Sequence, residues 1–139
     1  MRDKRLAALI ILGGILYAGH TADHIARGDV RWQAGPELFA FAAVTLLVYA
    51  VIALGLYFYR RAKIGPRFWT ISAAIAAAFG WYAHLSPFAD QTPSYIFKAY
   101  QSPMFGSLAL LDLFSLMLVL IAIAFHAGRL WLGQRSRTG

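Results

Sequence analysis

The stretch YAGHTADHIARGD, residues 17–29, places two histidines and an aspartate at the end of a long apolar run. In a helix His20 and His24 are one turn apart, and Asp23 lies on the same broad face. Imidazole and carboxylate groups suit zinc, copper or iron, and a metal-bound histidine usually donates its other N–H to a carboxylate. The motif HxxDH is a weak signal by itself, so other polar residues at the same depth must support it.

Two further polar residues lie on other apolar runs. His84 ends a stripe of small residues at helical spacing, which predicts that it points into a helix bundle. Counted from the helix ends, His24 and His84 lie within about 5 Å of one membrane interface, and His20 and Asp112 about 10 to 14 Å below it. Polar side chains at such depth need partners, so they define a candidate site.

These residues predict a metal site at the outer end of the molecule. His20, His24 and His84 are the candidate ligands, with Asp23 or Asp112 as a fourth ligand or as a hydrogen-bond partner of a ligand. The predicted ion is copper, zinc or iron, held within a membrane redox or metal-handling assembly. No catalytic residue is assigned, because Ser86 and Ser115 have no Ser-His-Asp context.

The composition is that of a membrane protein. Of 139 residues, 60% are hydrophobic and only 14% are charged, whereas soluble domains average about 25% charged residues. The absence of cysteine excludes disulfides, thiolate metal sites and CxxCH haem attachment. The net charge of +7 comes from basic clusters that flank apolar runs, which disfavours nucleic acid as a partner.

Four apolar runs are long enough to cross a hydrocarbon layer of about 30 Å. They predict an all-α, integral membrane four-helix bundle with up-down-up-down order in a single domain, residues 1–139. The predicted spans are residues 6–26, 38–59, 68–88 and 104–130. A short helix at the outer interface is predicted within residues 89–103.

Basic residues set the predicted orientation. Ten of the thirteen Lys and Arg residues lie at the N-terminus, in the connection 60–67 or at the C-terminal end. By the positive-inside rule both termini are cytoplasmic, and we expect a bacterial inner (plasma) membrane. A signal peptide at the start is disfavoured because no clear small-x-small cleavage site follows the apolar run.

Two other hypotheses stay open for the same residues. In the first, a histidine of the first span and His84 hold a b-type haem. In the second, the polar groups only hydrogen-bond between helices, and the chain is a structural or accessory subunit of a larger membrane complex. Stripes of small residues also lead us to expect a homo-oligomer or other membrane subunits beside the lipid bilayer.

The predicted orientation can be tested with reporter fusions. Fusions at Gly65 and Gly139 should report a cytoplasmic location, and a fusion at Gln91 an external one, because the basic clusters flank the first two sites. A cytoplasmic signal at Gln91 would contradict the common depth assigned to His24 and His84.

Overall fold

A computed structural model describes residues 3–30 and 35–136, which form five α-helices and no β-strand. The all-helical prediction is therefore confirmed. The helices are α1 (Lys4–Ala26), α2 (Pro36–Arg60), α3 (Pro66–His84), α4 (Pro93–Ala99) and α5 (Pro103–Arg135). Three basic residues used for the predicted orientation lie outside the described residues, namely Arg2, Arg31 and Arg137.

Proline marks the start of four helices. A proline at the first helical position has a suitable fixed φ, and its missing N–H would have had no partner within the helix. The helix α1 begins differently, because the Asp3 carboxylate caps it by accepting the backbone N–H of Leu6 at 2.7 Å. The four prolines are Pro36, Pro66, Pro93 and Pro103.

Two helix boundaries differ from the predicted spans by more than two residues. The third helix ends at His84 rather than at residue 88; Pro87 disfavours a helical conformation at the residue before it, so the chain turns early. The last helix continues past residue 130 to Arg135. The predicted short helix in the segment 89–103 is confirmed as α4, where the Thr92 hydroxyl accepts the backbone N–H of Tyr95 at 3.3 Å.

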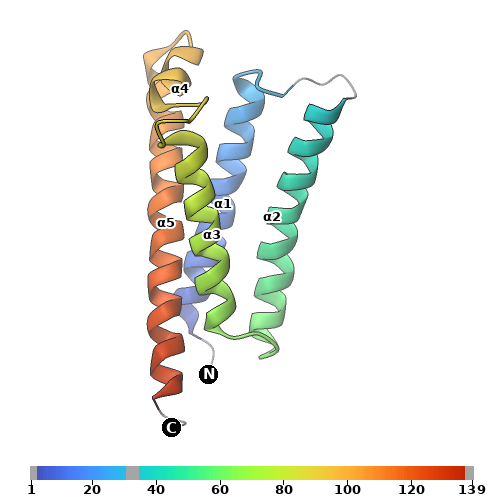
Figure 1. Ribbon diagram of the computed structural model, residues 1–139, viewed down its shortest axis with the longest axis vertical. Helices are drawn as coiled ribbons and strands as arrows, with labels where there is room; N and C mark the ends of the chain where they lie inside the picture. The colour runs from blue at the N-terminus through green and yellow to red at the C-terminus, as the bar shows by residue number, and fades with distance from the viewer. Residues whose placement is uncertain (1–2, 31–34, 137–139) are drawn as a thin grey trace.

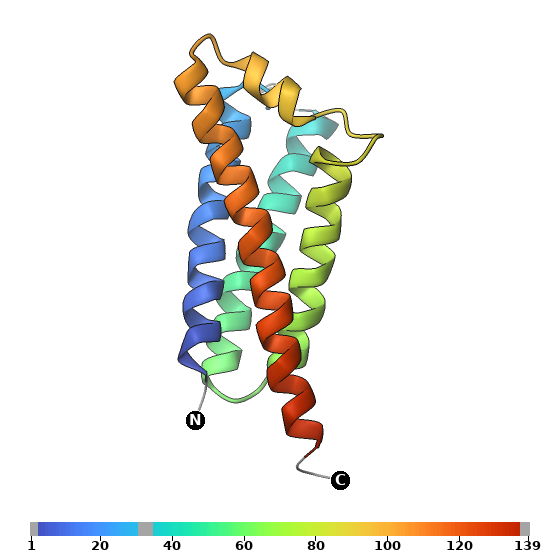
Figure 2. The ribbon, with the colours of Figure 1, turned by 90° about the vertical axis from the view of Figure 1, so that its left-hand side faces the viewer.

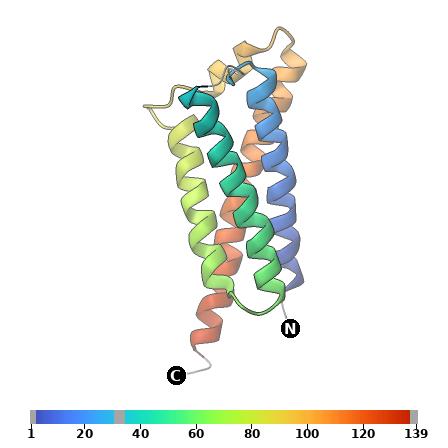
Figure 3. The same ribbon diagram turned by 90° about the vertical axis from the view of Figure 1, so that its right-hand side faces the viewer.

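The four long helices run side by side along the long axis of the molecule, and α4 lies across one end (Figures 1 and 2). The start of α1 and the end of α5 lie at the opposite end. The most extensive contacts are those of α5, which packs against α3, α1 and α4, whereas α2 contacts α1 (Figure 3). This arrangement brings the ends of α1 and α3 together beneath α4.

Two apolar clusters form the core. The cluster nearer the start of α1 draws on all four long helices and consists of Leu6, Ile10, Tyr59, Trp69, Ala73, Ile123 and Ala127. The second cluster joins α4 to α5 and consists of Ile96, Ala109, Leu113 and Met117. Gly80 lets α3 and α5 approach closely, because a Cβ there would lie 2.7 Å from the Met117 sulfur.

Large apolar side chains also cover the outside of the described residues. Leu46 is 68% exposed, Phe125 is 67% exposed and Ile15 is 63% exposed. Three helices, α1, α2 and α5, are long and apolar enough to cross a membrane. The alanine-rich α3 is not among them, so its span remains a prediction.

The cap at Asp3 gives a pH-dependent contribution to stability. The backbone N–H of Leu6, and after it His126, lower the pKa of the Asp3 carboxyl. The carboxylate therefore stabilises the fold fully above its ordinary pKa, and this contribution is lost as the pH falls through the lower pKa of the folded state. Asparagine is an equally good cap but carries no charge.

We therefore expect Asp3→Asn to lower the free energy of unfolding near neutral pH. The difference from the wild type should shrink as the pH is lowered from about 5 towards about 2. Thermal unfolding in detergent over this range measures it. A difference that does not change with pH would show that the charge of Asp3 contributes nothing.

Candidate metal centre

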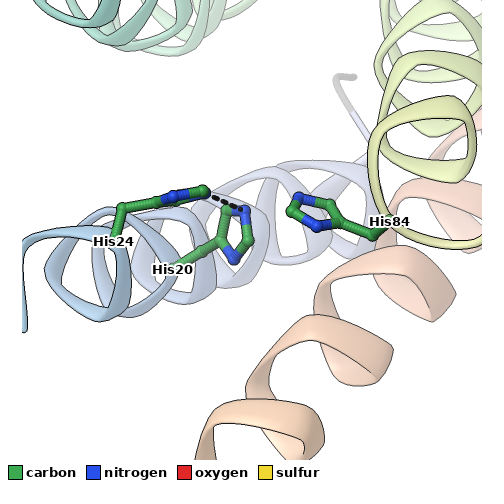
Figure 4. Close-up of side chains that lie close together, drawn as sticks. All are labelled: His20, His24 and His84. Carbon is green, nitrogen blue, oxygen red and sulfur yellow. Dashed lines mark hydrogen bonds between the residues drawn. The ribbon is translucent and has the colours of Figure 1, made fainter. Parts of the chain in front are cut away.

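Three histidine side chains meet where α1 and α3 end (Figure 4). His20 and His24 lie on consecutive turns near the end of α1, and His84 is the last residue of α3. One ligand nitrogen from each ring lies within 4.8 Å of the other two. His20 and His84 are buried, with 9% and 5% of their surface exposed. Their depth along the helices, read from the sequence, thus correctly predicted that His84 lies beside His20, 64 positions earlier in the chain.

The spacing of the rings is close to that of metal ligands. The Nε2 atoms of His20 and His24 are 3.2 Å apart. In a tetrahedral zinc site, bond lengths of 2.0–2.1 Å place two ligand nitrogens about 3.3 to 3.4 Å apart. The His84 ring centroid lies 5.1 Å from that of His20 and 5.8 Å from that of His24. The His84 ring thus lies beside both others, within reach of the same ion.

Two of the rings are oriented by hydrogen bonds through their other nitrogen. Nδ1 of His24 lies 3.1 Å from the Asp29 carboxylate, and Nδ1 of His84 lies 3.1 Å from the backbone carbonyl of Gln91. Both acceptors require a proton on Nδ1, which leaves the lone pair of each ring on Nε2. Metal-binding histidines are held in this way by carboxylates and carbonyls.

The contact between His20 and His24 then requires a proton or a cation. Once Nδ1 of His24 carries the proton, its Nε2 directs a lone pair towards Nε2 of His20. A second lone pair at 3.2 Å would be repulsive. Either His20 donates an Nε2 proton, or a cation lies between the two nitrogens. A metal ion between the rings would accept the lone pairs of both Nε2 atoms at once.

The position of Asp29 follows from the way α1 ends. Gly28 has φ of 77°, in the left-handed region that favours glycine. The backbone N–H of Gly28 donates to Ile25 O, and that of Asp29 donates to His24 O, each at 3.1 Å. This pair of bonds is a Schellman motif. It turns the chain back so that the Asp29 carboxylate faces the ring of His24.

A buried arginine joins two carboxylates beside the histidines. The Arg27 side chain is fully buried and lies 2.9 Å from both Asp23 and Asp29. Its Nη2 is also 3.3 Å from Nδ1 of His24. That contact would need a lone pair on Nδ1, and because Arg27 already has two carboxylate acceptors, we assign Asp29 as the partner of Nδ1. One guanidinium and two carboxylates carry a net charge of −1, which favours a cation nearby.

The two aspartates predicted to assist the metal lie in different surroundings. Asp23 binds Arg27 and accepts a hydrogen bond of 2.6 Å from the Tyr100 hydroxyl. Asp112 packs against α1, where a Cβ at Gly19 would lie 2.7 Å from its Oδ1. Its Oδ2 is buried and has no hydrogen-bond partner among the described residues. A role for either aspartate in metal binding stays a prediction.

Several residues around the histidines were not predicted from the sequence. Asp29 could have been found, because a glycine after the last turn of a helix signals a chain reversal. The carbonyl of Gln91 and the hydroxyls of Tyr95 and Tyr100 gave no such signal. They approach only because the segment 85–102, which contains α4, folds back over the ends of α1 and α3 (Figure 2).

Comparison with known proteins adds no assignment: the chain matches no protein-family model, no curated protein and no solved structure.

The two tyrosines over the site have raised pKa values. Burial, followed by the hydrogen bond to Asp23, raises the pKa of Tyr100 to about 12. The hydrogen bond from the Tyr95 hydroxyl to Asp29, at 3.0 Å, raises the pKa of Tyr95. In both cases the neutral phenol is favoured, because an ionised one would face a carboxylate.

We expect Tyr100 to ionise near pH 12. The phenol's contribution to stability should be present below its ordinary pKa of about 10 and be lost as the pH rises through the higher value. Ultraviolet absorbance of the wild type minus that of Tyr100→Phe isolates this titration. In an Asp23→Asn background the midpoint should fall. A midpoint near pH 10 in the wild type would contradict the contact with Asp23.

Proposed function

We propose that this chain is a four-helix integral membrane protein that binds a metal ion through His20, His24 and His84. The observation that carries the proposal is the convergence of three imidazoles, two of which have Nδ1 fixed by Asp29 and by the Gln91 carbonyl. Fixed tautomers with Nε2 lone pairs are what a metal ion needs. The protein would serve a membrane redox or metal-handling assembly.

The ligand types favour zinc, copper or iron. Imidazole suits all three metals, whereas magnesium and calcium prefer oxygen ligands. Three protein ligands leave one coordination position for water, a substrate or a carboxylate. Of the two aspartates, Asp112 has the spare capacity, because its Oδ2 has no hydrogen-bond partner among the described residues, whereas Asp23 is engaged by Arg27 and Tyr100.

A b-type haem is the weaker hypothesis for these histidines. Two axial imidazoles must lie on opposite faces of a flat macrocycle. The rings of His20 and His84 instead meet edge to face, with their centroids 5.1 Å apart and an interplanar angle of 87°. In an edge-to-face contact one ring presents its face to the other, so haem binding would require at least one ring to reorient.

The second candidate function is that of an accessory subunit without a metal. It is supported by the 3.2 Å contact between His20 and His24, a distance that also suits an N–H···N hydrogen bond. That bond would join two turns of α1, and the ring contact between His20 and His84 would pack α1 against α3. Metal analysis separates the two candidates.

The membrane setting completes the proposal. We infer that α3 crosses the bilayer together with α1, α2 and α5, with both termini cytoplasmic and the histidines towards the outer side. The exposed apolar faces of the three apolar helices support contact with lipid. The same faces suit lateral association with further copies or with other subunits of a bacterial inner membrane, and nothing about the chain favours nucleic acid.

The decisive experiment is metal analysis of the protein purified in mild detergent after growth with zinc, copper and iron. The wild type should carry a single ion per chain and show no Soret band. The metal ion should be lost in each of three variants, His20→Ala, His24→Ala and His84→Ala, since a site with three ligands rarely survives the loss of one. Asp29→Asn should weaken binding by about 10- to 100-fold, because it removes the carboxylate that orients His24.

His126→Ala is the matched control. His126 is the one remaining histidine of the sequence, and it contacts Asp3 at the other end of the molecule. Its replacement should leave the metal content unchanged. Circular dichroism checks that each variant is folded. Unchanged metal in both His24→Ala and His84→Ala, or no metal in the wild type, would refute the site, and the latter result would favour the accessory subunit.

A further inference from the structure

Two adjoining hollows lie at the end of the molecule opposite the histidine cluster, where α1 begins and the C-terminal half of α5 passes it. One has a volume of about 500 Å³ and the other about 470 Å³. Arg5 and His126 line both hollows, so the two adjoin at these side chains, and both are open to the surroundings and not enclosed. Nothing in the proposed metal site involves them.

The hollows differ in chemistry and in depth. The first is lined by the apolar side chains of Ala8, Leu9, Ala122 and Phe125. The second, which we call the polar hollow, has a mixed lining. It combines the polar side chains of Asp3, Lys4, Arg5, His126 and Gln134 with Tyr59, Pro66 and Leu130. Because α1 runs inward from Lys4 to Leu9, and α5 runs outward from Ala122 to Gln134, the polar hollow lies at the end of the molecule and the apolar hollow lies deeper.

The polar hollow carries positive charge. The one carboxylate in its lining, that of Asp3, is already bound to the backbone N–H of Leu6 at 2.7 Å and to Nε2 of His126 at 3.1 Å. Lys4 and Arg5 are exposed, and within residues 3–30 and 35–136 neither takes part in an ion pair. Two cations are therefore available to an anion.

We propose that the two hollows bind an anionic phospholipid. Its phosphate would lie against Lys4 and Arg5, and an acyl chain would follow the apolar hollow between α1 and α5. The lining residues match a ligand whose charged end lies at the end of the molecule and whose apolar end lies deeper. Basic pockets between membrane helices bind anionic headgroups in this way, and the apolar hollow distinguishes a lipid from free phosphate or another soluble anion.

Native mass spectrometry of the full chain in mild detergent tests the proposal. Phosphatidylglycerol is the probe, phosphatidylcholine is the zwitterionic comparison, and inorganic phosphate is the soluble one. The wild type should retain phosphatidylglycerol, bind phosphatidylcholine more weakly and show no competition from inorganic phosphate. The double variant Lys4→Gln, Arg5→Gln should bind phosphatidylglycerol about 30-fold more weakly, at about fivefold for each basic residue near the membrane surface.

Two further variants make the test specific. The double variant Arg60→Gln, Lys63→Gln removes the same charge from exposed residues outside both hollows and should bind as the wild type does. Ala8→Trp should fill the apolar hollow from an exposed position and weaken binding while the helical content stays unchanged. Equal losses in the two double variants, unaltered binding by Ala8→Trp, or displacement of the lipid by inorganic phosphate would each overturn the proposal.

Discussion

A guanidinium group buried between two carboxylates organises the end of the molecule that carries the histidines. Arg27 reaches Asp23 and Asp29 at 2.9 Å each, with its own side chain fully buried. Because an unpaired charge is strongly disfavoured away from water, the buried guanidinium holds both carboxylates close to it. Asp29 in turn holds the ring of His24. The orientation of the His24 imidazole thus depends on the ion pair between Arg27 and Asp29, neither of which needs to touch a metal.

The same ion-pair network fastens α4 over the site. The hydroxyl of Tyr95 donates to Asp29, and that of Tyr100 donates to Asp23, so each carboxylate of the network binds one tyrosine from the segment around α4. The carbonyl of Gln91, from the start of that segment, orients His84. Of these three contacts from a stretch of ten residues, one orients His84 directly, and the contact of Tyr95 supports the carboxylate that orients His24.

The sequence predicted the helices and the histidines better than it predicted their surroundings. Long apolar runs bounded by proline leave few choices of structure, and the depth of a residue follows from its position along a helix. That was enough to place His84 beside His20 and His24. It left the role of Asp112 open, because depth does not specify which way a side chain points around the helix axis. It also missed Gln91, whose position depends on the path of a loop.

The light packing of α2 has a consequence for the site. Only Gly55 and Tyr59 of its 25 residues are buried. If α2 crosses a bilayer as proposed, the match between its apolar length and the bilayer thickness would help to set its height. Yet Phe41 of this helix lies against His24, with ring centroids 6.1 Å apart. In that setting a change in bilayer thickness would act on the contact between Phe41 and the imidazole, so the lipid composition would become a mechanical input to the histidine cluster.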